Sequence, residues 1–213
     1  MNKEEIIRLL EDKRYDELLR IAADNRRIIK LLISLTYDKK SIVCWRAIES
    51  IGLITKEIAK TQPEHVRNLI GRLLWMIRDE SGGIGWSSPE MLGEIVRNSP
   101  ELFADVAPII VFFLEEEKLS RGVLWAIGRI GEVKKELVIH SAPQILQYLH
   151  NPDPMLRGLA AFALGKIGTL EYLKTIERLK NDNELIQFYE DEELNDKRVC
   201  AIAEDAIARI NTK

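Results

Sequence analysis

Residues that could carry out acid–base or metal chemistry include 34 Asp and Glu, three His and two Cys in this sequence of 213 residues, but no catalytic signature joins them. The three histidines, His65, His140 and His150, have no His or Cys four residues away, so the spacing of a helical metal site is missing. Glu90 and Glu94 share one helix face at i,i+4, but such a pair acts as acid and base only where one carboxyl group is desolvated. No catalytic residue, metal site or cofactor is therefore predicted, and the sequence favours a non-enzymatic role over catalysis.

The cysteines and the apolar runs indicate a compartment. Cys44 and Cys200 each precede apolar residues at helical spacing, which predicts that both thiols lie on buried helix faces of a protein in a reducing environment. The start of the chain carries acids and lacks the apolar core of a secretory signal. The longest apolar run, Val106 to Leu114, is interrupted by Pro108 and is shorter than the ~20 residues of a membrane span. We therefore expect a cytoplasmic protein with no membrane partner.

Residues 78–90 interrupt an otherwise regular helical pattern with three glycines in four positions. Ser87, with Glu90 three residues later, fits a capping box that starts the next helix. Backbone N–H groups beside a helix start can hold an anion, but Asp79 and Glu80 would repel one, and the ending of a phosphate loop is missing. We favour a structural connection. The alternative is a ligand contact or enzymatic site in the stretch 79–88, at Gly82, Gly83, Gly85, Ser87 and Ser88.

A repeat organises the helices that would position these residues. Ala163, followed by Ile167 and Gly168, aligns with four other anchor positions spaced by 44, 35, 37 and 43 residues along the chain, namely Ala47, Met91, Ala126 and Ala206. Spacings of this size are typical of solenoid repeats. An apolar-periodic helix precedes each anchor helix, so the pattern predicts stacked α-helical hairpins.

The segment from His150 to Gly168, HNPDPMLRGLAAFALGKIG, resembles a HEAT repeat of the kind first described in phycobilisome-lyase proteins. The resemblance rests on the Asp-Pro turn, the Arg, the Ala-Ala pair and the Leu-Gly-x-Ile-Gly ending. It implies an all-α fold, an α-α superhelix or solenoid of about five to six HEAT-like helical hairpins of the armadillo type. It implies no lyase activity, and a likeness to HEAT-like alkylpurine DNA glycosylases is one of fold alone.

The whole chain, 1–213, is predicted to be one HEAT-like repeat domain. Its parts are N-terminal capping helices (1–36), central repeats (37–181), an acidic insertion (182–196) and a C-terminal helix (197–213). The insertion holds seven acids and no Lys or Arg. We expect a solvated linker docked by Phe188 and Tyr189, with a recognition element as the alternative.

Residues one before and three after each anchor share a helix face that mixes charged and aromatic side chains. If this face lines the concave side of a superhelix, as the resemblance implies, it forms a binding groove rich in the aromatic and Arg residues of binding hot spots. The alternative is that each ring packs against the adjacent repeat and covers its glycines. The predicted groove residues are Arg46, Arg78, Trp86, Glu90, Glu94, Arg121, Trp125, Arg129, Arg157 and Phe162.

These observations favour a protein-binding scaffold or adaptor over two other classes. A small-molecule or anion site would use the glycine-rich connection, and a DNA-binding or glycosylase-like protein would need a basic stripe. The predicted groove alternates in sign, and the chain has a formal net charge of −3 and a pI of about 5.8. The charge pattern therefore does not favour nucleic acid. The sequence does not indicate which protein is bound or how many copies assemble.

Overall fold

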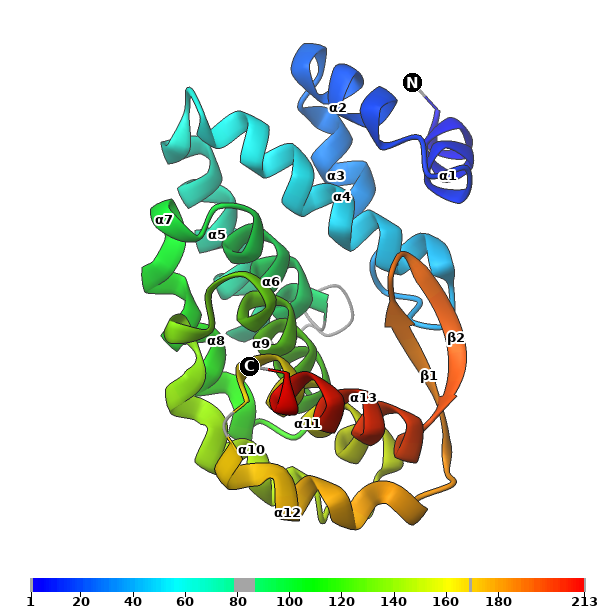
Figure 1. Ribbon diagram of the computed structural model, residues 1–213. Helices are drawn as coiled ribbons and strands as arrows, with labels where there is room; N and C mark the ends of the chain where they lie inside the picture. Colours follow the sequence, from blue (N-terminus) through cyan, green and yellow to red (C-terminus); the bar gives the residue numbers. More distant parts are fainter. Residues whose placement is uncertain (1, 79–86, 169, 213) are drawn as a thin grey trace. The chain divides into compact units, whose positions relative to one another are not determined.

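The computed structural model describes residues 2–78, 87–168 and 170–212 (Figure 1). Contacts divide the chain into two compact units. Unit 1 is formed by residues 1–103 and 189–194, and unit 2 by residues 104–188 and 195–213. The prediction of a single domain stays a prediction. In the described part of the chain, no helix combines the length and the apolar character that crossing a bilayer requires.

Unit 1 is built around one long helix, α4. Its helices are α1 (Lys3–Glu11), α2 (Tyr15–Asp24), α3 (Arg27–Ile33), α4 (Ile42–Ala59), α5 (Pro63–Arg78), α6 (Ser88–Asn98) and α7 (Pro100–Phe103). Helix α4 contacts α1, α2, α3, α5 and α6. The anchors Ala47 and Met91 are fully buried on α4 and α6, as are Ile51 and Ile95 four residues after them. The repeat register predicted from the sequence is therefore correct in this unit.

Local side-chain chemistry explains where several helices begin. The side chain of Asn2 accepts a hydrogen bond from the Glu4 amide at the start of α1. Asn25 does the same for the Arg27 amide, as its position before α3 predicts. Helix α5 begins at Pro63, which fits the first turn because proline lacks the N–H that has no partner there.

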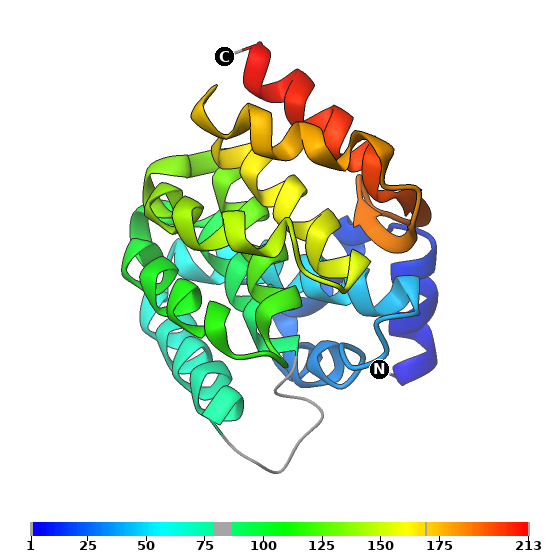
Figure 2. The ribbon, with the colours of Figure 1, turned by 90° about the horizontal axis from the view of Figure 1, so that it is seen from below.

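Unit 2 stacks three anchor helices. Its helical elements are η2 (Ala104–Val106), α8 (Ala107–Phe112), η3 (Phe113–Glu115), α9 (Ser120–Lys134), η4 (Lys135–Leu137), η5 (Ile139–Ser141), α10 (Ala142–Tyr148), α11 (Pro154–Ile167), η6 (Leu170–Tyr172), α12 (Leu173–Ile176), η7 (Glu177–Asn181) and α13 (Val199–Asn211). Helix α11 packs against both α9 and α13 (Figure 2). The anchors Ala126, Ala163 and Ala206 are buried.

Small residues allow this close stacking. A Cβ atom added to Gly128 on α9 would lie 2.2 Å from the ring of Phe162, and one added to Gly165 on α11 would lie 2.7 Å from the backbone of Ala206. Both distances are too short for real contacts. Gly128 and Gly165, each two residues after an anchor, therefore mark close helix approaches.

Two helical segments are interrupted, and one expectation about burial is wrong. The segment that begins at Pro100 is divided into α7, η2, α8 and η3, and the segment 170–181 is divided into η6, α12 and η7. Pro108 has no N–H to donate, which helps to explain the first break. Cys44 is fully buried, but Cys200 is only half-buried.

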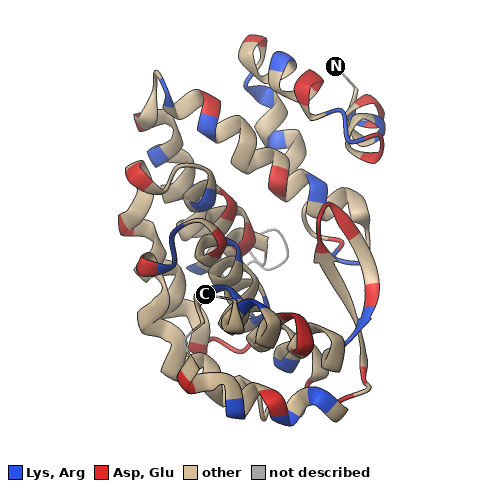
Figure 3. Cartoon of the chain, in the orientation of Figure 1, with Lys and Arg blue, Asp and Glu red and all other residues tan. Residues whose placement is uncertain are grey.

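The acidic insertion is a β-hairpin and not a linker. Strands β1 (Leu185–Glu190) and β2 (Glu193–Arg198) form a two-stranded sheet with acids at its turn (Figure 3). Phe188 and Tyr189 are 3% and 2% exposed, so the predicted docking by these aromatics is correct. Asp191 and Glu192 form the two-residue turn with φ of 51° and 63°, as a tight hairpin requires.

Candidate functional site

Most side chains of the predicted groove are buried. Trp125 is 1% exposed and Glu94 is fully buried, and the same class includes Arg46, Glu90, Arg129 and Phe162. Arg157 is half-buried, Arg78 and Arg121 are exposed, and Trp86 lies outside the described residues. The expectation of an exposed stripe is wrong for the buried positions, because other elements of the same unit cover this side of the anchor helices.

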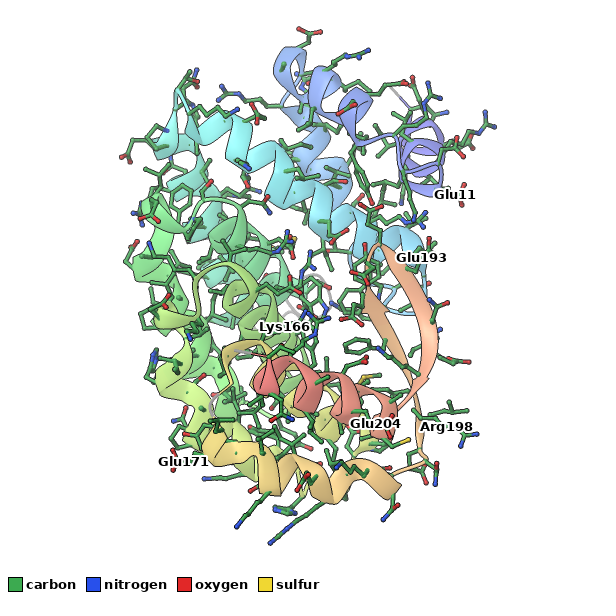
Figure 4. The ribbon with its side chains drawn as sticks, in the orientation of Figure 1. Glu11, Lys166, Glu171, Glu193, Arg198 and Glu204 are labelled. Carbon is green, nitrogen blue, oxygen red and sulfur yellow. The ribbon has the colours of Figure 1, made fainter. Side chains whose placement is uncertain are left out.

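In unit 2 the buried stripe is a layer of rings and cations. The carboxylate of Glu132 pairs with Arg129 at 3.3 Å and also with Lys166, which is labelled in Figure 4. The Arg129 guanidinium lies 5.3 Å from the Trp125 ring centroid, and the Lys166 ammonium lies 5.1 Å from that of Phe162. These charges are tolerated inside the unit because each has an opposite charge and a ring face beside it.

Phe162 packs against the adjacent repeat, which was the alternative to a binding groove for these rings. It covers Gly128 on the neighbouring helix, and its ring meets Phe188 of β1 edge-on with 5.2 Å between centroids. Ile186 of the same strand covers Gly158 on α11. The aromatic of this repeat is therefore part of the packing between elements and is not offered to solvent.

In unit 1, Arg46 on α4 holds the end of α1 and the turn of the hairpin. Its guanidinium donates to the backbone oxygens of Leu10 and Glu11, at 3.2 and 2.8 Å, and to that of Glu192 at 3.1 Å. It also pairs with the Glu193 carboxylate at 3.3 Å, and Glu11 and Glu193 are both labelled in Figure 4. The last carbonyl groups of a helix lack partners within the helix, so this arginine acts as a cap.

Two tyrosines and a carboxylate complete this cluster. The Tyr189 hydroxyl donates to Glu49 at 2.6 Å, and its ring stacks on Trp45 with 5.2 Å between centroids and 11° between planes. Burial, with the nearby charges of Glu49 and Glu192, raises the pKa of Tyr15 far above its ordinary value. Hydrogen bonding to Lys13 lowers the pKa of Glu193. The two shifts favour a neutral Tyr15 and a charged Glu193, which suits a structural role.

The start of α6 does not form the capping box that the sequence suggests. Ser87 makes no side-chain cap, because its hydroxyl donates to the backbone oxygen of Thr36. Glu90 pairs with Lys39, whose ammonium lies 4.7 Å from the Trp45 ring centroid. In the described structure, the buried Ser88 Oγ and Glu90 Oε2 have no hydrogen-bond partner. Gly82, Gly83 and Gly85 of the predicted ligand loop lie outside the described residues.

The two other arginines of unit 2 that were predicted as groove residues form pairs of their own. Arg121 binds Asp153 through Nε and Nη2 at 3.0 and 2.7 Å. Arg157 binds Asp182 at 2.6 Å, and this hydrogen bond raises the pKa of its guanidinium. Arg157 also donates to the backbone oxygens of Asn151 and Pro152. It therefore fixes the Asn-Pro-Asp turn before α11 and is not free to bind a partner.

On α5 the arrangement differs from that of the buried stripe. Arg78 is exposed and makes no ion pair with any described residue. Trp75, three residues before it, is 65% exposed. Trp75 is not among the predicted groove residues, although the sequence carries a signal for it. The core residues Val66, Leu69, Ile70 and Leu73 define the buried side of the helix, and Trp75 falls outside their periodicity.

No family model matches this chain. An uncharacterized protein of Archaeoglobus fulgidus is 28% identical over 165 residues, which are 76% of this chain and 86% of that relative. An engineered protein of known crystal structure matches with a TM-score of 0.56 and 16% identity. The match covers all of this chain and 98% of the engineered chain. A designed armadillo repeat protein in complex with the peptide (KR)4 matches with a TM-score of 0.52 and 17% identity. The match covers 99% of this chain and 100% of the designed chain. The structure of computationally designed armadillo repeat proteins for modular peptide recognition has a TM-score of 0.50 and 16% sequence identity. The match covers 99% of this chain and 100% of that chain.

The fold is an α-α solenoid like that of armadillo repeat proteins. Similarity at this low identity is evidence for the fold alone. What this repeat protein binds must therefore be argued from its own residues. In the described part of the chain, no three His, Cys, Asp or Glu side chains are grouped so that they could hold a metal ion.

Large apolar side chains remain exposed on this repeat protein, mostly outside its anchor helices. Phe112 on α8 is 75% exposed, Trp75 on α5 is 65% exposed, and Leu102 on α7 is 44% exposed. Others are Tyr37, Ile109, Val133, Leu170 and Leu185. Single exposed apolar residues are ordinary, but exposed Trp is depleted on most surfaces and enriched at binding hot spots. The candidate functional surface is therefore among these residues and not in the buried stripe.

Proposed function

We propose that this chain is a protein-binding scaffold without catalysis of its own, which presents exposed side chains on a frame of stacked helices. The observation that carries the proposal is the repeat fold, which matches designed armadillo proteins over 99% of the chain, one of them in complex with a peptide. Stacked repeats suit this role because they offer long surfaces and each repeat contributes side chains to them.

The state of the charged residues supports the same proposal. Arg46, Arg129 and Lys166 are buried and paired with carboxylates, so these cations already take part in packing. Partner contacts would then come from the exposed aromatic and arginine residues outside the buried stripe. The segment 150–168 supports membership of the HEAT-like repeats named from phycobilisome-lyase proteins, and we place the protein in the cytoplasm.

Selection from a displayed library of random 12-residue peptides, followed by titration calorimetry, tests this function. We expect enriched sequences that bind the folded protein in a saturable manner with micromolar dissociation constants, as is usual for short peptides. The Ala163→Glu variant, in which a charge enters the core of unit 2, serves as a destabilised control for non-specific adhesion. If no recovered peptide distinguishes the folded protein from this control, the scaffold proposal is rejected.

A further inference from the structure

Gly71 has no packing reason to be glycine. It lies in the middle of α5, and a Cβ atom built on it would meet nothing within 4 Å. A glycine inside a helix costs about 1 kcal/mol relative to alanine. Gly128 and Gly165 repay that cost because a side chain there would strike Phe162 or Ala206. Gly71 has no such neighbour among the described residues, so they leave space at this position for another molecule.

Trp75 stands directly beside this space. It follows Gly71 by four residues, and side chains at i and i+4 lie next to each other on a helix. Long side chains on a helix lean back over the preceding turn, so the turn below the indole is the one that Gly71 leaves bare. With 65% of its surface exposed, Trp75 offers an apolar ring beside a notch in the helix surface.

Two arginines flank Trp75 on the described part of α5. Arg72 and Arg78, three residues before and after Trp75, are both exposed, and neither makes an ion pair with any described residue. Arg67, one turn before Gly71, donates to the backbone oxygen of Leu102 at 2.6 Å and lies 5.1 Å from the Phe103 ring centroid. This contact fixes α5 against α7.

We propose that Gly71, Arg72, Trp75 and Arg78, here called the α5 face, bind an acidic segment of a partner protein. An apolar side chain of that segment sits over Gly71 against the Trp75 ring, and its carboxylates pair with Arg72 and Arg78. The proposal rests on the scaffold function and adds the chemistry of the partner. Arg72 and Arg78 are six residues apart, about 9 Å along a helix, which matches a motif of about three extended residues.

Charge favours a short acidic protein segment over nucleic acid. A duplex carries one negative charge per ~1.7 Å, so its charge would extend far beyond two arginines. The whole chain has a formal net charge of −3, which opposes a long polyanion more strongly than a segment with two or three carboxylates. A protein motif with two or three carboxylates and one apolar side chain matches the number and type of groups on the α5 face.

The test uses an array of synthetic 12-residue peptides in three classes, acidic with Leu or Phe, basic with the same apolar residues, and uncharged with the same apolar residues. A 12-residue oligothymidylate is added as the nucleic acid probe. Binding to the full chain is measured by fluorescence anisotropy at low and high salt. We expect the acidic class to bind best. Trp75→Ala and Gly71→Leu should each weaken this binding about tenfold, and Arg72→Glu combined with Arg78→Glu should weaken it by a similar factor or more.

These variants alter exposed or open positions, so their folding should be intact, and circular dichroism checks this. Phe112→Ala, at an exposed position of unit 2, is the matched control and should leave the dissociation constant within about twofold. Equal binding of all three peptide classes, or acidic binding unchanged by Trp75→Ala, overturns the inference and leaves the scaffold function standing. Oligothymidylate binding that Trp75→Ala weakens more than acidic-peptide binding also overturns it. If no peptide of any class binds, the scaffold function fails as well.

Discussion

Single residues show that a charged side chain is no sign of exposure in this protein. Arg46 is 5% exposed and has four oxygen acceptors, from Leu10, Glu11, Glu192 and Glu193. A guanidinium presents five N–H donors in a fixed fork, so several acceptors can satisfy it away from water. Truncating such a group would leave buried carbonyl oxygens without donors, which costs more than the hydrogen bonds themselves contribute.

Trp125→Ala should lower the free energy of unfolding by about 3–5 kcal/mol, because it removes a large buried ring and leaves a cavity. Trp125 is 1% exposed and lies beside the Arg129 guanidinium. Trp75→Ala is the matched control, and its effect should stay within about 0.5 kcal/mol because that ring is mostly in solvent. Urea denaturation measures both. Equal losses for the two variants would contradict the assignment of Trp125 to the core.

The thiol of Cys44 should make the free energy of unfolding depend on pH in the alkaline range. Burial raises its pKa to about 12, so the folded state keeps the proton that the unfolded chain releases above about pH 8.5. The stability that depends on this protonated thiol is fully present below pH 8.5 and is lost as the pH rises toward 12. One such group changes the free energy of unfolding by up to about 1.4 kcal/mol per pH unit in that window.

Urea denaturation of the wild type and of Cys44→Ala at pH 8, 9.5 and 10.5 measures this dependence. The stability of the variant should fall less steeply above pH 9 than that of the wild type. Cys200→Ala is the matched control, since Cys200 is only half-buried, and its stability should follow the wild-type slope. Parallel slopes for the wild type and Cys44→Ala would contradict the prediction.

At the scale of elements, the hairpin replaces the linker that an acidic stretch suggests. Ile186 and Phe188 alternate with exposed Leu185 and Gln187, which is the period-2 pattern of a half-buried strand. Seven acids in the segment conceal this pattern, because acidic composition is typical of solvated chain. The acids lie mostly at the turn and on exposed positions, while the aromatics carry the packing.

Tyr189→Phe should lower the free energy of unfolding by about 1–3 kcal/mol. The change keeps the ring that stacks on Trp45 but removes the hydroxyl that donates to the buried Glu49 carboxylate. Tyr37→Phe is the matched control because Tyr37 is 59% exposed, and its effect should stay within about 0.5 kcal/mol. Thermal and urea unfolding measure both variants. A loss no larger than that of the control would mean that the hairpin turn contributes nothing through this bond.

At the scale of the whole molecule, a repeat protein transmits a local defect through neighbouring helices. Stability in such folds is close to a sum of repeat terms and terms between neighbours. Helix α11 contacts α9 and α13, so these three helices should respond together to a change within α11.

Ala163→Glu should cost about 4 kcal/mol or more, since it places a carboxylate at a fully buried position of α11. Hydrogen–deuterium exchange with mass spectrometry should show lost protection in α9, α11 and α13, and a smaller change in α1 and α5. Ala208→Glu introduces the same side chain at an exposed position of α13 and should leave protection unchanged. Uniform loss of protection across the chain would show that it unfolds as one cooperative block.

Local chemistry allowed the sequence alone to determine the repeat and many helix limits. Proline at the first position of α5 and asparagine before α1 and α3 act within one helical turn, so their effect can be read without knowing the fold. Ala163 and the glycines beside it recur because small residues are needed wherever two helices meet closely. The register of the repeats and the burial of their anchors were therefore predictable.

Which side of each helix faces water was decided only by the tertiary structure. Arg46 is covered by the turn at Glu192, 146 residues away in the chain, and no spacing within α4 records that contact. Phe162 is covered by Phe188 of the hairpin, while Trp75 is 65% exposed. Burial depends on which distant element packs against a face. Most of the described part of the stripe predicted as a groove is therefore buried, and an indole outside the core periodicity became the candidate binding surface.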